Sequence, residues 1–82
     1  DPESALPLDE DTFNRRRRVL GPEHPDTLAS AHNLALTLRD VGKYELAREL
    51  HEDTHARMQE VLGVDHPDTL ISEENVHRLS GR

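Results

Sequence analysis

Residues 20–28 read LGPEHPDTL and residues 62–70 read LGVDHPDTL, a near-duplication at a separation of 42 residues. The same register extends in both directions, and 15 of the 33 residue pairs aligned between 8–40 and 50–82 are identical. Self-similarity at a period of 20–50 residues indicates an array of structural repeats, each too small to bury its apolar face alone. The chain is therefore expected to be built from stacked repeats.

Each period carries signals for two helices. Pro25 and Asp26 suit the first turn of a helix, and Gly42 suits the residue that follows its C-terminal end. Apolar side chains recur at helical spacing on both sides of Gly42. The first stripe is Leu28, Ala31, Ala35 and Leu38, and the second is Tyr44, Ala47, Leu50, Thr54, Met58 and Val61. The sequence thus predicts an all-α fold of antiparallel helix hairpins, with four helices at 8–20, 25–40, 43–62 and 67–79.

The register also predicts the domain organisation. We expect residues 1–7 to form a disordered or extended segment and residues 8–82 to form a single helical domain. This domain begins with the second helix of one repeat, contains one full repeat at 24–63, and ends with the first helix of a last repeat at 67–79. About three repeats are usual for stable stacking.

The last predicted helix is more polar than its counterpart. Glu73, His77 and Ser80 occupy the positions at which the full repeat has Ala31, Ala35 and Leu38. Terminal repeats require a polar outer face for solubility. We therefore expect residues 67–79 to act as a C-terminal cap.

Residues 33–50, NLALTLRDVGKYELAREL, resemble the tetratricopeptide repeat, in which Leu-Ala, a bulky residue, Gly-x-Tyr and a small Ala follow one another along a helix pair. Those positions are here Leu34, Ala35, Leu38, Gly42, Tyr44 and Ala47. The 42-residue period and the LGxxHPDTL junction resemble the long-helix variant of kinesin light chains, which also occurs in large bacterial signalling proteins. The resemblance implies an α-solenoid fragment that acts as a non-catalytic scaffold for protein–protein interaction and needs no cofactor.

The resemblance further implies a concave groove lined by the first helices of the repeats, in which an asparagine binds the backbone of an extended peptide. Asn33 and Asn75 occupy that place, and an amide suits it because it both donates and accepts hydrogen bonds. Arg39 would pair with a carboxylate of the ligand. The alternative is that the two asparagines cap or brace neighbouring helices. The other groove residues would be Ala29, His32 and Leu36 from the full repeat, with Ile71, Glu74 and Arg78 from the last helix.

Residues 51–55 read HEDTH, the H-E-x-x-H pattern that places two zinc-binding histidines on one helical face beside a catalytic glutamate. The residues one period earlier read DEDTF, and positions 58 and 61 lack the glycine and histidine of the extended motif. We therefore predict no catalytic residues and interpret His51 and His55 as ordinary helix-surface histidines. Adventitious metal binding by this pair is a weaker alternative, and a zinc hydrolase using Glu52 is the least favoured.

Composition narrows the classes of partner. The 82 residues carry a formal charge of −7 and no cysteine, which excludes disulfides and thiolate metal sites. The basic run at 15–18 points in four directions on a helix and has no interleaved aromatic residues for base stacking. We expect neither a nucleic acid nor a membrane as partner and predict a cytoplasmic location. The excess of arginine over lysine is typical of a GC-rich bacterial source.

Two junction residues and one helix face complete the predictions. His24 and His66 belong to the HPD junctions and are interpreted as helix-start residues. Phe13 indicates that the first helix has an apolar face, so the open N-terminal end is a candidate surface for forming a homo-oligomer. The partner is therefore either a protein or peptide bound in the groove, or a second copy of the chain in a self-association module without a peptide ligand.

Overall fold

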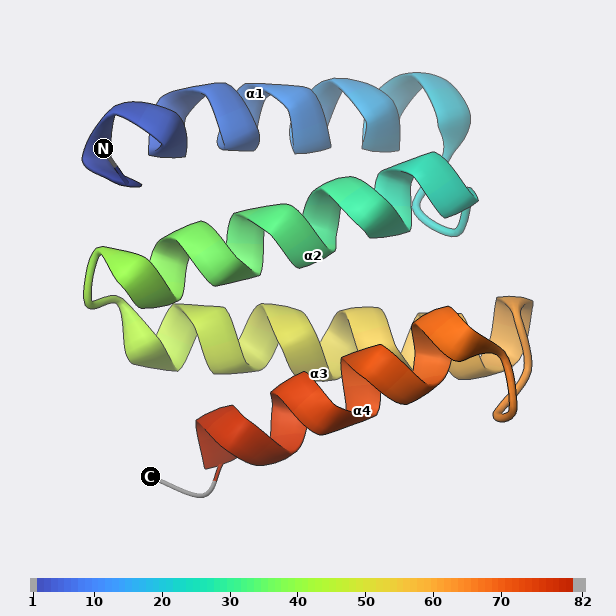
Figure 1. The fold of residues 1–82 in the computed structure, drawn as a ribbon. Helices are drawn as coiled ribbons and strands as arrows, with labels where there is room; N and C mark the ends of the chain where they lie inside the picture. Colours follow the sequence, from blue (N-terminus) through green and yellow to red (C-terminus); the bar gives the residue numbers. More distant parts are fainter. Residues whose placement is uncertain (1, 81–82) are drawn as a thin grey trace.

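The computed structural model describes the backbone of residues 2–80 and the side chains of residues 3–74. Within this part the chain forms four α-helices, and each packs against the next in an antiparallel arrangement (Figure 1). The all-α helical-repeat architecture predicted from the sequence is confirmed. The helices are α1 (Pro2–Leu20), α2 (Pro25–Asp40), α3 (Tyr44–Val61) and α4 (Pro67–Ser80).

The N-terminal prediction is wrong, because residues 2–7 are helical rather than extended or disordered. Helix α1 begins at Pro2, where a proline is favourable because its missing N–H would have no partner within the helix. Pro7 lies inside the same helix and removes only one backbone hydrogen bond, close to the helix start. Leu6 packs against the apolar core, which holds this first part of α1 on α2.

Histidines start both first helices of the repeats. His24 is the N-cap of α2, and its Nδ1 accepts a hydrogen bond of 3.0 Å from the backbone N–H of Asp26. His66 accepts the equivalent bond of 3.1 Å from the backbone N–H of Asp68. The imidazole thus satisfies one of the N–H groups that a helix start leaves without a partner. The predicted helix-start role of both histidines is confirmed.

Gly42 ends α2 as the sequence predicts. Its φ of +89° is a left-handed conformation in which a side chain would be strained, although nothing lies within 4 Å of the position that a Cβ would occupy. The backbone N–H groups of Gly42 and Lys43 donate to the carbonyl groups of Arg39 and Leu38, at 3.0 and 2.8 Å. This pair of bonds is a Schellman motif, which reverses the chain into α3.

The core consists mostly of small side chains. All four residues of the first predicted stripe are buried, whereas the second is buried at Ala47, Thr54 and Met58 and exposed at its ends. Tyr44 and Val61 are exposed because they begin and end α3. Leu34 also joins the core, and the buried polar side chains are Thr27, Ser30, His51, Thr54, Thr69 and Ser72. Small residues at these positions allow the helices to approach closely.

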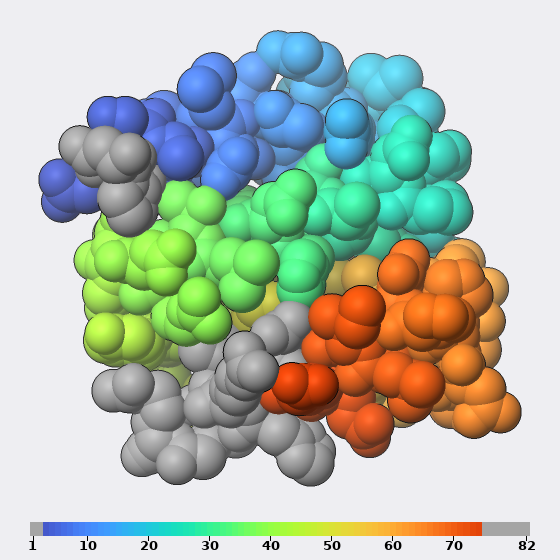
Figure 2. All heavy atoms as spheres, viewed as in Figure 1, coloured from blue at the N-terminus to red at the C-terminus, as the bar shows by residue number. Residues whose placement is uncertain are grey.

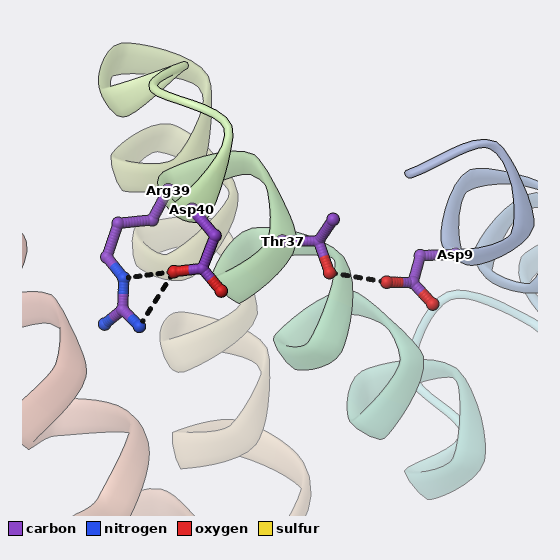
Figure 3. Close-up of polar contacts among 4 residues, drawn as sticks. All are labelled: Asp9, Thr37, Arg39 and Asp40. Atoms are coloured by element: carbon purple, nitrogen blue, oxygen red, sulfur yellow. Dashed lines mark hydrogen bonds and ion pairs between the residues drawn. The ribbon is translucent and has the colours of Figure 1, made fainter. Parts of the chain in front are cut away.

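Polar contacts fix α1 on α2. The Thr37 hydroxyl donates a hydrogen bond of 2.6 Å to the Asp9 carboxylate (Figure 3). At the other end of the interface, Arg16 donates to the Ser30 hydroxyl at 2.8 Å and to the Asp26 carbonyl at 3.2 Å. These bonds set the position of α1 along α2.

Candidate functional site

A cleft of about 530 Å³ lies between the N-terminal halves of α2 and α4, with the C-terminal part of α3 at its base. Figure 2 shows the surfaces of α2 and α4 toward the viewer, with part of α3 recessed between them. The apolar residues that line the cleft are Pro25, Leu28, Ala29, Met58, Leu62 and Ile71, and the polar ones are His32, Asn33, His66 and Asp68. The cleft therefore has a mainly apolar wall with a few polar groups.

Four of the predicted groove residues line this cleft, namely Ala29, His32, Asn33 and Ile71. Ala29, Asn33 and Ile71 are exposed, and His32 is half-buried. The three predicted residues that belong to α2, namely Ala29, His32 and Asn33, fall within two turns, so the helix presents them on one face.

The remaining groove candidates lie elsewhere. Leu36 and Arg39 are half-buried on α2, farther toward its C-terminus, and Glu74 is exposed on α4. None of the three lines the cleft. The side chains of Asn75 and Arg78 lie outside the described residues.

Sequence reasoning missed the base and one end of the cleft. Met58 near the end of α3 and Leu62, its C-cap residue, lie about one turn apart and supply the apolar base, while His66 and Asp68 come from the second HPD junction. The helical spacing of Met58 and Leu62 and the repetition of the junction are signals that would have found them. The groove prediction omitted them because it considered only the first helices of the repeats.

Asp68 gives the cleft a negative charge. Burial lowers the pKa of His32 below its usual value, and the nearby Asp68 carboxylate only partly opposes this shift. His32 is therefore neutral at neutral pH and adds no positive charge beside Asp68. Arg39 does not supply a compensating cation, since its guanidinium pairs with Asp40 at 3.3 Å (Figure 3).

The interpretation of His51 as a helix-surface histidine is wrong. Its side chain is 1% exposed, and its ring meets the ring of His32 edge-on at a centroid distance of 5.3 Å. Burial, followed by the proximity of His32 and Arg39, lowers the pKa of His51 to about 4. His51 is buried because it lies on the face of α3 that contacts α2, next to Ala47 and Thr54. His55, one turn later, is half-buried rather than on the open surface.

The HEDTH segment does not gather in one place the groups that a zinc hydrolase needs. His51 is inside the core, whereas Glu52 is exposed to solvent. Among the described residues, no three histidine, aspartate or glutamate side chains are placed to share a metal ion. Both ring nitrogens of His51 and Nδ1 of His55 lack hydrogen-bond partners in the same part of the chain.

The four arginines of residues 15–18 do not form one basic surface. Arg15 pairs with Asp11 on the exposed side of α1, and Arg16 turns toward α2. The guanidinium of Arg17 lies 5.3 Å from the centroid of the Phe13 ring, a cation–π contact. The run therefore divides among separate local contacts, as its spacing on a helix predicts.

An antiparallel array of helix pairs with an open cleft between first helices defines the molecule as an α-solenoid. The chain belongs to the tetratricopeptide repeat family, because the model of this family matches residues 1–26 and 27–68. Repeats of this family generally mediate protein–protein interaction as scaffolds and are generally non-catalytic. No curated protein matches the sequence. In the described part of the chain, no helix is both long and apolar enough to cross a membrane.

Proposed function

We propose that this chain is a protein-interaction scaffold whose cleft between α2 and α4 binds a peptide segment of a partner protein, without a chemical step. The observation that supports this function is the cleft of about 530 Å³, which combines an apolar base with an exposed asparagine. Ligand sites typically have volumes of roughly 300–1,000 Å³ and a few polar groups that orient the ligand.

The lining suggests what such a peptide carries. An aliphatic or aromatic side chain fits against Leu28, Met58 and Ile71, where it would be removed from water. The Asn33 amide can both donate to and accept from the peptide backbone. Asp68 favours a basic group close to the apolar anchor, because no lysine or arginine is among the described residues that line the cleft. We therefore propose an extended segment with an apolar anchor and an adjacent lysine or arginine.

A longer ligand would reach residues outside the cleft. Leu36 and Arg39 follow Asn33 along α2, and Glu74 follows Ile71 along α4. Leu36 offers further apolar surface to such a segment. Arg39 would have to exchange Asp40 for a carboxylate of the ligand, so its contribution to affinity is expected to be smaller than that of Asn33.

Selection from a random peptide library displayed on phage tests this proposal. Peptides are selected on the wild-type chain and then measured against two matched variants, Ala29→Arg and Ala56→Arg. Both alanines are exposed helix positions, but only Ala29 lines the cleft. We expect Ala29→Arg to abolish binding and Ala56→Arg to preserve it, with Asn33→Ala weakening affinity about tenfold through loss of a hydrogen bond.

Two results would contradict the proposal. One is that the selected peptides bind Ala29→Arg as tightly as they bind wild type, which would place their site elsewhere. The other is that selection enriches no peptide, which would remove peptide binding by this cleft.

A further inference from the structure

A shallow groove of about 620 Å³ runs between α1 and α3, on the side of α2 that faces away from the cleft. Leu34 and Leu38 of α2 form its floor. Leu38 follows Ala29, which lines the cleft, by about two and a half turns, so the two side chains point to opposite sides of α2. The groove thus lies between the second helices of two repeats, whereas the cleft lies between first helices.

The core cluster reaches solvent in this groove. Leu34 and Leu38 are 7% and 6% exposed, and Phe13 of α1 and Leu50 of α3 pack against them but stay half-buried. Leu46, one turn before Leu50, is 53% exposed. We call these five side chains the apolar strip. An exposed apolar surface with a polar rim is typical of a site that another protein covers.

Carboxylates line both walls of the groove beside the apolar strip. Glu10 belongs to α1, Glu49 and Asp53 belong to α3, and all three residues are exposed. Asp53 pairs with Arg57 at 3.1 Å, whereas Glu10 and Glu49 form no ion pair with another described residue. No lysine or arginine is among the described residues that line the groove. The groove therefore complements a ligand that carries apolar and basic groups together.

The arginine next to Glu49 in the sequence does not neutralise the groove. Arg48 pairs with Glu45, which raises the pKa of Arg48 more than Glu49 does. Glu10 and Glu49 are thus available to a basic ligand.

The walls of the groove favour a helical ligand over an extended one. All described lining residues lie within α1, α2 or α3, so their backbone groups offer no row of partners to an extended chain. The only side-chain amide among them is that of Asn14, and its oxygen already accepts a hydrogen bond of 3.2 Å from Arg17. A helix satisfies its own backbone hydrogen bonds and needs only side-chain contacts from a groove.

We propose that this groove is a second interaction surface, which binds a basic amphipathic helix of a partner protein. The apolar side chains of that helix lie on Phe13, Leu46 and Leu50. Its flanking lysines or arginines pair with Glu10 and Glu49. A second copy of this chain is the less suitable occupant, because its formal charge of −7 opposes approach to these carboxylates. The groove shares no described lining residue with the cleft, so the proposal does not depend on peptide binding there.

Peptide selection with the cleft blocked tests the groove. A random peptide library displayed on phage is selected on the chain carrying Ala29→Arg, and the enriched peptides are measured by fluorescence anisotropy against further variants of that chain. Leu46→Arg places a cation in the groove, while Leu70→Arg places one at a leucine of α4 outside it, with 50% exposure against 53% for Leu46. We expect Leu46→Arg to weaken binding about tenfold or more and Leu70→Arg to preserve it.

A second pair of variants measures the charge complementarity. Glu10→Gln combined with Glu49→Gln removes the two carboxylates without ion pairs, whereas Glu52→Gln combined with Glu60→Gln removes the same charge from exposed positions of α3 outside the groove. We expect the first combination to weaken binding about fivefold at low salt and less at high salt. The second combination should leave the affinity within about twofold of its original value. All substituted side chains are exposed, so the variants are expected to fold.

Three results of the selection would overturn the proposal. They are the enrichment of no peptide, the enrichment of peptides without basic residues, and equal binding to the chains with and without Leu46→Arg. Equal effects of the two glutamine combinations would overturn it as well. Sedimentation of the unsubstituted chain tests the other occupant, since a dimer that Leu46→Arg dissociates would show a second copy in the groove and overturn the proposed partner.

Discussion

The buried ring of His51 makes the stability of the fold depend on pH. The side chain is 1% exposed, neither of its nitrogens has a hydrogen-bond partner within the described residues, and its pKa is lowered to about 4. Among the described residues, the charged or titratable groups that shift its pKa are His32 and Arg39, and both oppose its protonation. Protonation of His51 is therefore strongly unfavourable in the folded state, whereas it carries no such cost in the unfolded chain.

The size of the effect follows from the two pKa values. The ordinary histidine value is 6.5, and the folded value is about 4. At 1.36 kcal/mol per pH unit, this difference is worth roughly 3 kcal/mol of unfolding free energy. Domains of this size have a total stability of roughly 4–12 kcal/mol, so His51 alone controls a substantial part of it.

The sign of this pH dependence follows from how many protons each state binds. The unfolded state has the higher pKa, so it binds more protons than the folded state between pH 6.5 and about 4. The stability associated with neutral His51 is fully present above pH 6.5 and is lost progressively as the pH falls toward 4. Acid therefore destabilises the fold through this residue.

Urea unfolding followed by circular dichroism at 222 nm, at pH 7.0 and pH 4.5, measures the effect. His51→Leu removes both the titration and the unpartnered nitrogens, whereas His51→Gln removes only the titration. Relative to wild type, each variant should gain about 2–3 kcal/mol of unfolding free energy between pH 7.0 and pH 4.5. At pH 7.0, the leucine variant should also be the more stable of the two, because glutamine leaves a buried amide without a partner.

The difference in unfolding free energy between wild type and a variant reports on His51 alone, because the two proteins share every other titratable group. Stability curves for wild type and His51→Leu that run parallel from pH 7.0 to pH 4.5 would refute the reasoning. Parallel curves would mean that the imidazolium is accommodated in the fold, through a shift of α2 or entry of water.

Three further predictions concern the junctions and the α1–α2 interface. Gly42→Ala should lower the unfolding free energy by roughly 1–2 kcal/mol, measured by urea unfolding, because its φ of +89° strains an L-residue. His24→Ala should cost about 1 kcal/mol through loss of the N-cap acceptor, while His24→Asn should retain most of the stability. A double-mutant cycle with Asp9→Ala and Thr37→Val should give a coupling of about 1 kcal/mol or more for the charge-assisted bond between them. A coupling near zero would show that this bond adds nothing to the interface.

The repeat made most of the fold predictable from the sequence. The near-identical junctions at 20–28 and 62–70 place the same start signal and the same glycine in both copies, and the structure builds the same turn twice. The start of α1 was predicted too far along the chain, because the alignment of the two repeat copies began at Leu8. Extending the register by one turn aligns Ala5 with Ala47, which is a signal that the helix begins earlier.

The candidate site was only partly predictable, because a cleft is formed by neighbours that are distant in sequence. Ala29, His32 and Asn33 were found from their place on one helix, and Ile71 from the equivalent place one period later. Met58 was assigned to the core and is indeed buried, yet it also forms the base of the cleft. Periodicity identifies the face of a helix, but it does not say where two facing helices leave a gap.

His51 shows why sequence comparison within the repeat failed at one position. Its aligned residue, Asp9, is half-buried and accepts a hydrogen bond from Thr37, so a polar side chain is satisfied there. His51 lies instead beside His32, which contributes an aromatic edge and no hydrogen bond to either ring nitrogen. The same position in the two copies thus has different chemistry, because Asp9 meets Thr37 of α2 whereas His51 meets His32 of the same helix. A histidine placed for metal binding would turn its nitrogens toward other ligands, whereas this one turns them into the core.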